Sequence, residues 1–189
     1  MPSAKQEQLV ESALGLFERL GFHAVGIDRV LAEAGVAKMT LYNHFRSKDE
    51  LIVATLELKD RRFRSWLMTE VERRASEPRD RLLAIFPTLS EEVDQPEFSG
   101  CIFARAAAEF GEMDHPVHQA AAEHKRLVRQ YISTLAAAAG AAEPQRLAFQ
   151  LGALMDGLMV NQQIGGCEVL CDAVHESARK LIDDAIPVK

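Results

Sequence analysis

Apolar residues recur every three or four positions along most of this chain, which is the spacing of one face of an α-helix. The first stripe ends at Gly21, a residue that commonly terminates helices, and consists of Leu9, Ala13, Leu16, Phe17 and Leu20. The second ends at Gly35 and consists of Ile27, Val30, Leu31 and Ala34. A short third helix follows, with Leu41 and Phe45 on one face. The pattern therefore predicts three helices within the first 46 residues.

The rest of the chain continues the helical pattern. A fourth helix is expected from Ser47 to about Arg74, because Ser47 and Glu50 fit the capping box Ser-x-x-Glu. Further helices are expected from about Arg79 to Val93, in the segment that runs to Phe110, from about Pro116 to Ala139, after Pro144, and over a last stretch that includes Leu170 and Ala185. Pro87 falls inside one of them and is expected to kink or end it. No segment alternates with period two, so we predict an all-α fold of about nine helices.

The two C-terminal helices carry more apolar surface than one neighbour can cover. The wide stripe of the first consists of Leu147, Leu151, Leu154, Met155, Leu158 and Met159. The stripe of the second has nearly heptad spacing and consists of Leu170, Val174, Leu181 and Ala185. These helices are expected to form a four-helix interface with a second copy of the chain. The alternative is that they fold back entirely into their own core.

The short third helix has the chemistry of a DNA reader. A short helix displayed after a glycine turn is typical of the helix-turn-helix, which places its second helix in the major groove. Its outward side chains can pair with base edges or phosphates, and Met39 suits a thymine methyl group. Lys38, Arg46 and Lys48 are basic, and no acid lies between residues 38 and 48.

Charge limits how such a protein can bind nucleic acid. The chain has a net charge of -6 and a pI near 5.5, which excludes binding through bulk positive charge. A DNA footprint is therefore expected to be small and focused. Lys48 stands in the first turn of the fourth helix, where a cation is unfavourable unless an anion is near. A DNA phosphate would be such an anion. The simpler interpretation of Lys48 is a solvated surface lysine.

Residues 9–56 resemble the DNA-binding domain of the TetR family of transcriptional regulators. The residues that carry the resemblance are Ala13, Leu16-Phe17, Gly21-Phe22, Ala34-Gly35-Val36, Thr40-Leu41-Tyr42, His44-Phe45, Ser47-Lys48 and Leu51. The resemblance implies DNA contacts at Lys38, Met39, Thr40, Tyr42, Asn43, His44 and Lys48. It also implies a DNA-binding domain at residues 1–47 and a ligand-binding and dimerisation domain at residues 48–189.

Two positions depart from the family pattern. Val25-Gly26 stand where the family usually has a phosphate-binding Thr near the start of its second helix. Ala37 replaces the usual Ser before the recognition helix, so that helix is expected to lack a side-chain cap. These departures support an alternative, namely a helical small-molecule-binding or adaptor protein that no longer reads DNA.

The segment Gly100-Cys101, with the apolar residues and Ala108-Glu109-Phe110 that follow, also resembles a subset of TetR-family effector domains, in which this helix borders the ligand pocket. Arg105 and Glu109 are four residues apart and either pair on the surface or, if buried, orient a polar ligand group. Trp66 suits core packing as well as a ligand. The expected ligand-binding residues are Phe63, Trp66, Phe86, Ile102, Phe103, Ala106, Met155, Met159 and Gln162.

Other chemistry has weak support. Zinc-type ligands are offered by Asp114, His115, His118 and Cys101, with His124 further on. Strong zinc signatures come as two spaced pairs, so no metal or cofactor is expected. Cys167 and Cys171 are one helical turn apart, and they are either a redox or metal pair or small buried apolar groups. No catalytic pattern or phosphate loop is present, which argues against an enzyme.

The expected compartment is the cytoplasm. The three cysteines suit a reducing compartment, there is no basic-then-apolar leader, and no apolar run approaches the roughly 20 residues of a membrane span. Taken with the resemblance, the sequence predicts a ligand-responsive, dimeric transcriptional regulator. It is expected to be a repressor that a small lipophilic molecule releases from a palindromic double-stranded DNA operator.

Overall fold

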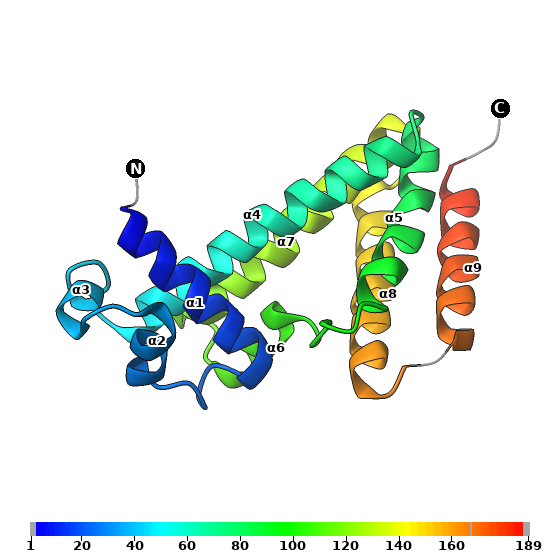
Figure 1. Ribbon diagram of the computed structural model, residues 1–189. Coiled ribbons are helices and arrows are strands. Elements are labelled where there is room, and N and C mark those ends of the chain that lie inside the picture. Colours follow the sequence, from blue (N-terminus) through cyan, green and yellow to red (C-terminus); the bar gives the residue numbers. More distant parts are fainter. Residues whose placement is uncertain (1–2, 167, 187–189) are drawn as a thin grey trace. The chain divides into compact units, whose positions relative to one another are not determined.

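The chain is helical throughout the residues that the computed structural model describes, 3–166 and 168–186, with nine α-helices and no strand (Figure 1). The prediction of an all-α fold with about nine helices is confirmed. In chain order the helices are α1 (Ala4–Leu20), α2 (Ile27–Ala34), α3 (Lys38–Tyr42), α4 (Lys48–Arg74), α5 (Pro78–Val93), α6 (Ile102–Glu109), α7 (Pro116–Ala138), α8 (Pro144–Ile164) and α9 (Glu168–Ala185). None of these helices has both the length and the apolar composition needed to cross a membrane.

Two compact units make up the chain, and each is assembled from two separate segments. The first unit comprises Met1–Arg62 and Cys101–His124, and the second comprises Phe63–Gly100 and Lys125–Lys189. Helices α4 and α7 each contribute residues to both units. The compact units therefore do not divide at the predicted boundary after residue 47. That boundary describes the DNA-reading segment alone, and as a functional division it stays a prediction.

In the first unit, α1, α2 and α3 pack against one another (Figure 1). The first apolar stripe is buried as predicted, except that Leu20 at its end is 39% exposed. The rings of Phe17 and Phe22 lie 5.2 Å apart, and Phe110 meets Phe22 edge-on at 6.0 Å. The same core includes Ile102 and other residues of α6 and α7. The DNA-reading helices therefore share one hydrophobic core with a segment much later in the chain.

Gly35 forms the turn between α2 and α3. Its φ of 61° lies in the left-handed region, which side chains adopt only with strain. The N–H of Gly35 donates to Ala32, and the N–H of Val36 donates to the carbonyl of Leu31 at 3.2 Å. These bonds satisfy carbonyls that the end of α2 would otherwise leave without partners. The turn thus ends α2 and starts α3 three residues later.

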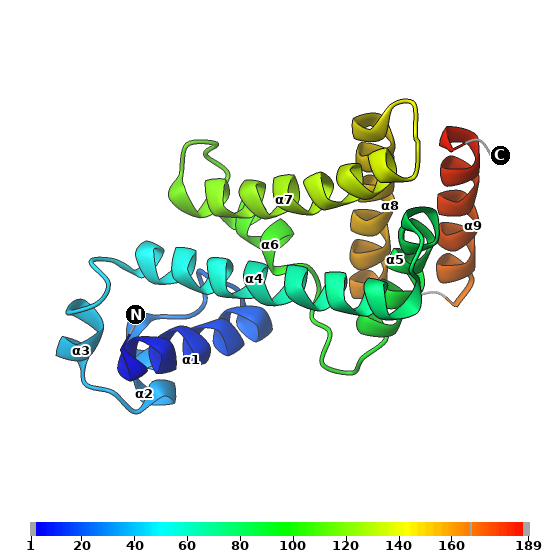
Figure 2. The same cartoon turned by 90° about the horizontal axis from the view of Figure 1, so that it is seen from above.

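In the second unit, α5, α8 and α9 pack together (Figure 2). Polar side chains add links between these helices. Ser90 of α5 lies 2.9 Å from a ring nitrogen of His175 on α9, and Arg79 forms an ion pair with Asp183. Near the other end of α5, Gln162 donates to Asp94 at 3.1 Å. The three helices form a packed layer held by an apolar core and by these cross-links.

Pro87 does not end α5, which runs from Pro78 to Val93 without interruption. The proline therefore does not end its helix, which was one of the two expected effects, and a kink at this position stays a prediction. Because proline has no N–H, the carbonyl of Leu83 one turn earlier cannot receive its usual helical hydrogen bond. At the next position, the hydroxyl of Thr88 donates a hydrogen bond to the carbonyl of Ala84 at 2.8 Å. The buried face of α5 outweighs the loss of one backbone bond.

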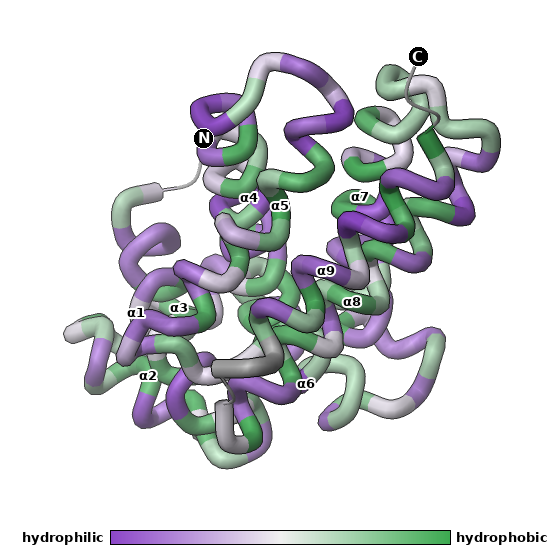
Figure 3. The backbone as a smooth tube through the Cα atoms, turned by 90° about the vertical axis from the view of Figure 1, so that its right-hand side faces the viewer, coloured by the Kyte–Doolittle hydropathy of each residue, from purple (hydrophilic) through white to green (hydrophobic). Residues whose placement is uncertain are grey.

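The C-terminal helices turn their predicted stripes mostly inward. On α8 the stripe is buried in its own chain apart from the half-buried Leu154. On α9 the buried face consists of Val174, Ala178 and Ile182, followed by Ile186 just beyond the helix, whereas the predicted Leu181 and Ala185 are half-buried. The side chain of Leu170 lies outside the described residues. Figure 3 shows hydrophobic and hydrophilic segments alternating along both helices.

The exposed apolar residues of α8 are a different set from the predicted stripe. Phe149 is 63% exposed, Val160 is 41% exposed and Ile164 is 79% exposed. The guanidinium of Arg129 on α7 lies over the Phe149 ring, 4.9 Å from its centre. The inward-facing stripe thus contributes to the core, and the apolar surface open to a partner is carried by these three residues.

Candidate functional site

The short helix α3 separates its apolar and outward side chains cleanly. Leu41 and Phe45 are buried against the domain, with exposures of 0% and 3%. On the outer side, Met39 is 71% exposed and Tyr42 is 48% exposed. Of the remaining predicted DNA contacts, Lys38 and Asn43 are exposed, while Thr40 and His44 are half-buried. The predicted contacts therefore lie on or beside one accessible surface, although their binding to DNA stays a prediction.

The start of α3 has no side-chain cap. Ala37 occupies the N-cap position of α3 and makes no such bond, as the sequence predicted, and Gly26 makes none at the start of α2. Backbone N–H groups at these helix starts are left without a side-chain acceptor, which suits an approaching phosphate. Lys38 lies 3.6 Å from Asp28, but both side chains are largely exposed, so the pair contributes little.

Lys48 is not a solvated surface lysine. Its ammonium donates to the carbonyl of Phe22 at 2.6 Å and so ties the start of α4 to the turn after α1. The capping box around it is only partly as predicted. Ser47 accepts from the N–H of Glu50 at 3.2 Å, but the Glu50 carboxylate accepts from the N–H of Arg46 rather than from Ser47. A phosphate contact by Lys48 stays a prediction, and such a contact would use its remaining donors.

The N-terminus of α1 meets the loop after α3. The Ser3 hydroxyl accepts from the N–H of Gln6 and so caps α1, and it lies 3.1 Å from a ring nitrogen of His44. The Gln8 side chain donates to the last carbonyl of α2, at Ala34. Polar side chains of α1 therefore hold both helices of the reader in position.

Arg105 and Glu109 of α6 both bond the backbone at the end of α1 and in the turn that follows it. Arg105 donates to the carbonyls of Phe17 and Glu18, at 3.1 and 2.7 Å, and so caps the C-terminal end of α1 with a cation. Glu109 accepts from the N–H groups of Phe22 and His23, at 3.0 and 2.7 Å. We call these two residues the α6 clamp, since together they hold the end of α1 and the turn that follows.

The α6 clamp also sets the ionisation of Glu109. Partial burial by itself would raise the pKa of this carboxyl, but the hydrogen bonds donated by the backbone of His23 and Phe22 act against it. The His23 side chain, whose Nδ1 lies 2.8 Å from the carboxylate, also lowers the pKa. The net result is a pKa below the ordinary value, so Glu109 is a carboxylate at neutral pH.

Three histidines, His23, His115 and His118, lie around Phe110. His23 and His115 stack on the Phe110 ring at 4.9 and 4.8 Å. His115 also lies 3.5 Å from the Asp49 carboxylate, and His118 lies 2.9 Å from the Phe110 carbonyl. Among residues 3–166 and 168–186 no three His, Cys, Asp or Glu side chains stand in a metal-binding arrangement. The imidazoles of His115 and His118 are thus used in contacts with other residues of the first unit.

The expected ligand-binding residues fall into two groups. Ile102, Phe103 and Ala106 on α6 are buried in the core of the first unit. The second unit holds the other six, which are Phe63, Trp66, Phe86, Met155, Met159 and Gln162. Phe63 and Trp66 pack with ring centres 5.6 Å apart. Which of the nine contact a ligand stays a prediction.

A buried histidine lies next to Phe103, and from the sequence this residue was a candidate only as a metal ligand. His124 on α7 is 4% exposed, and its Nδ1 lies 2.8 Å from the Asp60 carboxylate on α4. The Phe103 ring stacks on the imidazole at 3.5 Å and is nearly parallel to it. One residue from each of three helices thus meets at this point. The pairing joins distant positions, so the sequence pattern carried no sign of it.

Tyr131 is a second group that the sequence did not single out. Its hydroxyl is buried and has no hydrogen-bond partner within the described part of the chain. Burial raises the pKa of this phenol, so the hydroxyl is protonated and able to donate. An unsatisfied buried hydroxyl is costly unless a ligand or water completes it. Tyr131 is therefore a candidate polar contact for an effector in the second unit.

The cysteines give little information about redox chemistry. Cys101 and Cys171 are half-buried. Cys167 lies outside the described residues, so the proposed pairing of Cys167 with Cys171 cannot be followed in the structure. Cys101 occupies the N-cap position of α6 and makes no side-chain cap there.

Comparisons with known proteins agree with this geometry. The family model described as "Bacterial regulatory proteins, tetR family" matches residues 9–55, and that of the "Tetracyclin repressor-like, C-terminal domain" matches residues 78–178. A TetR-family regulator from Streptomyces coelicolor, SCO4454, is 30% identical, with a TM-score of 0.89 over 98% of this chain and 91% of its own.

Two curated Escherichia coli proteins are also similar. The transcriptional regulator YjdC is 20% identical over 178 residues, which are 94% of this chain and 93% of YjdC. The transcriptional repressor NemR is 28% identical over 116 residues, which are 61% of this chain and 58% of NemR. Two family domains in sequence, a matching fold and an accessible helix after a left-handed glycine turn lead to one conclusion: the chain belongs to the TetR family of transcriptional regulators, with an N-terminal DNA-binding helix-turn-helix and a C-terminal effector domain.

Proposed function

We propose that this protein is a homodimeric repressor that a small lipophilic molecule releases from a palindromic operator. The observation that carries the proposal is the exposed polar surface of α3, displayed behind the turn at Gly35. Two such helices would enter successive major grooves about 34 Å apart, so the operator would be palindromic. The proposed DNA contacts are Lys38, Met39, Thr40, Tyr42, Asn43, His44 and Lys48.

The outward residues of α3 divide by role. Asn43 carries an amide, which suits bidentate pairing with adenine, and Met39 suits a thymine methyl group. Lys38 and Tyr42 suit phosphate oxygens, which fix the register without reading sequence. Because the chain is acidic overall, these contacts would be few and the salt dependence moderate.

Effector control would act through α6. This helix lies in the part of the chain that matches the C-terminal family model, yet the α6 clamp holds α1 and the turn after it. Ile102, Phe103 and Ala106 of the same helix share the core of the reader. An effector that favours one position of α6 over another would therefore shift the reader as well. A coupling of about 1–3 kcal/mol would change operator affinity roughly 5–150-fold.

Dimerisation would use α8 and α9. The exposed apolar residues of α8, Phe149, Val160 and Ile164, form a surface suited to a second copy. Family members act as two-fold dimers on two-fold DNA sites, and this proposal follows that symmetry. We place the protein in the cytoplasm, where its DNA partner is found, and assign it no catalytic step.

Fluorescence anisotropy with labelled duplex from the promoter beside its own gene tests the proposal, with excess random DNA present. Asn43→Ala should weaken binding by about 1–3 kcal/mol and relax the preference at one base pair. Lys38→Ala should weaken binding to all sequences and reduce the salt slope by about one. Arg73→Ala, at an exposed arginine near the end of α4 in the second unit, is the matched control and should bind normally.

Lys48→Ala is a poor probe of DNA contact, because it also breaks the bond to the Phe22 carbonyl. Selective binding that Asn43→Ala and Lys38→Ala both leave unchanged would contradict the assigned reading surface. If neither the promoter nor a selected random pool were bound, the chain would instead be a helical adaptor that no longer reads DNA. The departures of Val25-Gly26 and Ala37 from the family pattern are the features that favour that alternative.

A further inference from the structure

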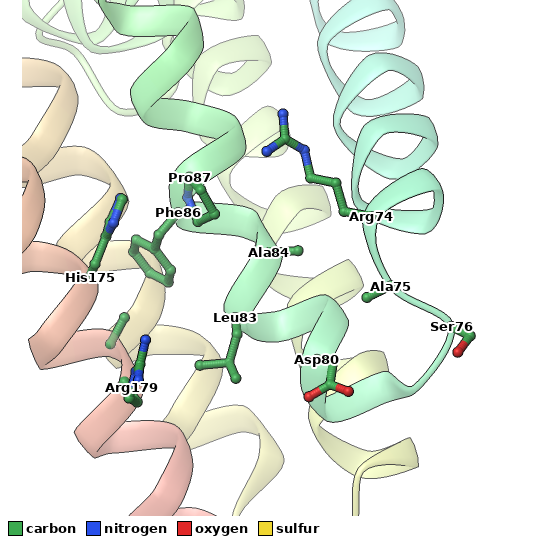
Figure 4. Close-up of a pocket in the computed structure, with 11 residues that line it drawn as sticks. Arg74, Ala75, Ser76, Asp80, Leu83, Ala84, Phe86, Pro87, His175 and Arg179 are labelled. Carbon is green, nitrogen blue, oxygen red and sulfur yellow. The ribbon is translucent and has the colours of Figure 1, made fainter.

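A groove of about 580 Å³ lies in the second unit, bordered by the end of α4, by α5 and by α9 (Figure 4). Its volume is within the range of small-molecule sites, about 300–1,000 Å³. Of the residues predicted to bind a ligand, only Phe86 lines it. The groove is therefore a separate candidate from the sites that the sequence indicated.

The apolar side chains that line the floor of the groove belong mainly to α5. It is formed by Leu83, Ala84, Phe86 and Pro87, with Ala178 from α9. Ala84 and Ala178 are small and buried, so the groove is hollow where larger side chains would fill it. Pro87 also leaves the Leu83 carbonyl without its helical donor at this place. The floor suits the apolar body of a small molecule.

The borders of the groove are mostly basic. Figure 4 shows Arg74 on one side of α5 and His175 and Arg179 on the other. Asp80 is the acidic residue of the lining, and its carboxylate lies 3.6 Å from the guanidinium of Arg79. The negative charge of Asp80 is thus partly offset, and the basic groups determine which ligand charge is favoured.

The basic side chains of the groove differ in how many hydrogen bonds and ion pairs they already form within the chain. Both terminal nitrogens of Arg74 bond the Glu91 carboxylate, while its buried Nε has no partner in the described residues. His175 uses one ring nitrogen for the Ser90 hydroxyl. Arg179 is exposed, and the acidic residues within one turn of it on α9 are paired elsewhere, Asp183 with Arg79 and Glu176 with Lys180. The uncompensated positive charge therefore lies at the α9 side.

We propose that this groove binds a small amphipathic carboxylate, whose apolar body lies on α5 and whose carboxylate is held by Arg179 beside His175. Arg suits this role because its planar guanidinium can bind a carboxylate through two parallel hydrogen bonds. The regulatory part of the inference, that such a ligand acts as an effector, rests on the proposed function. The binding itself does not, since it can be measured without DNA.

Isothermal titration of the full-length protein with sodium decanoate, kept below its micelle concentration, tests the binding. One decanoate should bind per chain, and Arg179→Gln should weaken it about tenfold or more, as expected for the loss of a charge-assisted pair. Ala75→Trp, which keeps the charge but fills the groove from the loop after α4, should also weaken it. Arg146→Gln, at an exposed arginine of α8, is the matched control and should bind normally.

Each other outcome overturns the inference. Absence of binding, or equal binding of the uncharged decanol, would exclude an anion site. Decanoate binding that neither Arg179→Gln nor Ala75→Trp alters would place the ligand elsewhere in the chain. Thermal melting of each variant distinguishes a lost site from a lost fold. Addition of decanoate to the operator complex then shows separately whether the groove controls DNA release, so failure of the repressor proposal leaves the binding result intact.

Discussion

A single carboxylate, that of Glu109, holds two consecutive backbone N–H groups and an imidazole in the turn after α1. Its pKa lies below the ordinary value, so the folded state prefers the charged form. A carboxyl of this kind stabilises the fold fully above its ordinary pKa of about 4.3. The contribution is lost as pH falls through the lower folded-state pKa.

Glu109→Gln should therefore lower the free energy of unfolding by about 1–3 kcal/mol at neutral pH, because charge-assisted bonds become ordinary ones. The difference from the unchanged protein should shrink as pH falls through about 4 and disappear below the folded-state pKa. Urea unfolding from pH 7 down to about pH 3 measures both quantities. Glu143→Gln, at an exposed residue paired only with Arg146, should show little effect at any pH. A pH-independent loss at Glu109 would contradict the assigned role of its charge.

The contacts that Glu109 makes could not be predicted from the sequence, because its spacing from Arg105 suggests a different interaction. Arg105 and Glu109 have the spacing of a helical ion pair, and that spacing was the basis of the surface-pair alternative. Their partners lie 86–88 positions away in the chain, at Phe17, Glu18, Phe22 and His23. Local periodicity contains no information about such contacts. Similarly, the pairing of Asp60 with His124 across 64 positions could not be inferred from spacing.

At the scale of elements, periodicity predicted most helices within a few residues. The α3 surface was also predictable, because a five-residue helix after a glycine turn has only one way to bury Leu41 and Phe45. Periodicity was less informative where a helix has more than one apolar edge. On α9 periodicity predicted that Leu181 and Ala185 would be buried. The structure instead buries Ala178 and Ile182, which lie on a neighbouring face of the helix.

Pro87 gives a test at this scale. Pro87→Ala should restore an N–H to the Leu83 carbonyl and stabilise α5 by about 1 kcal/mol. Pro78→Ala is the matched control, because proline in the first turn of α5 costs no hydrogen bond, and it should give no gain. Thermal unfolding compares the two variants. A lower melting temperature for Pro87→Ala would mean that packing of the proline ring outweighs the missing bond.

For the whole molecule, the proposed dimer depends on residues that the sequence pattern did not select. Phe149→Asp should place a charge in the interface and shift the protein toward monomer, with weaker operator binding as a result. Met113→Asp, at a 76% exposed residue of the first unit, is the control for adding a charge to an apolar surface site. Sedimentation velocity over a range of protein concentrations measures the change. An unchanged association state for Phe149→Asp would place the interface elsewhere.

The first unit is also discontinuous along the chain, and this affects how the protein is made. Its core needs Ile102, Phe103 and Ala106 as well as the residues before position 62. During synthesis the reader helices emerge first, but their core is incomplete until the segment up to His124 has left the ribosome. Until then Phe22 and its neighbours lack their cover, so premature termination before α6 should yield an unstable, aggregation-prone product rather than a short DNA-binding protein.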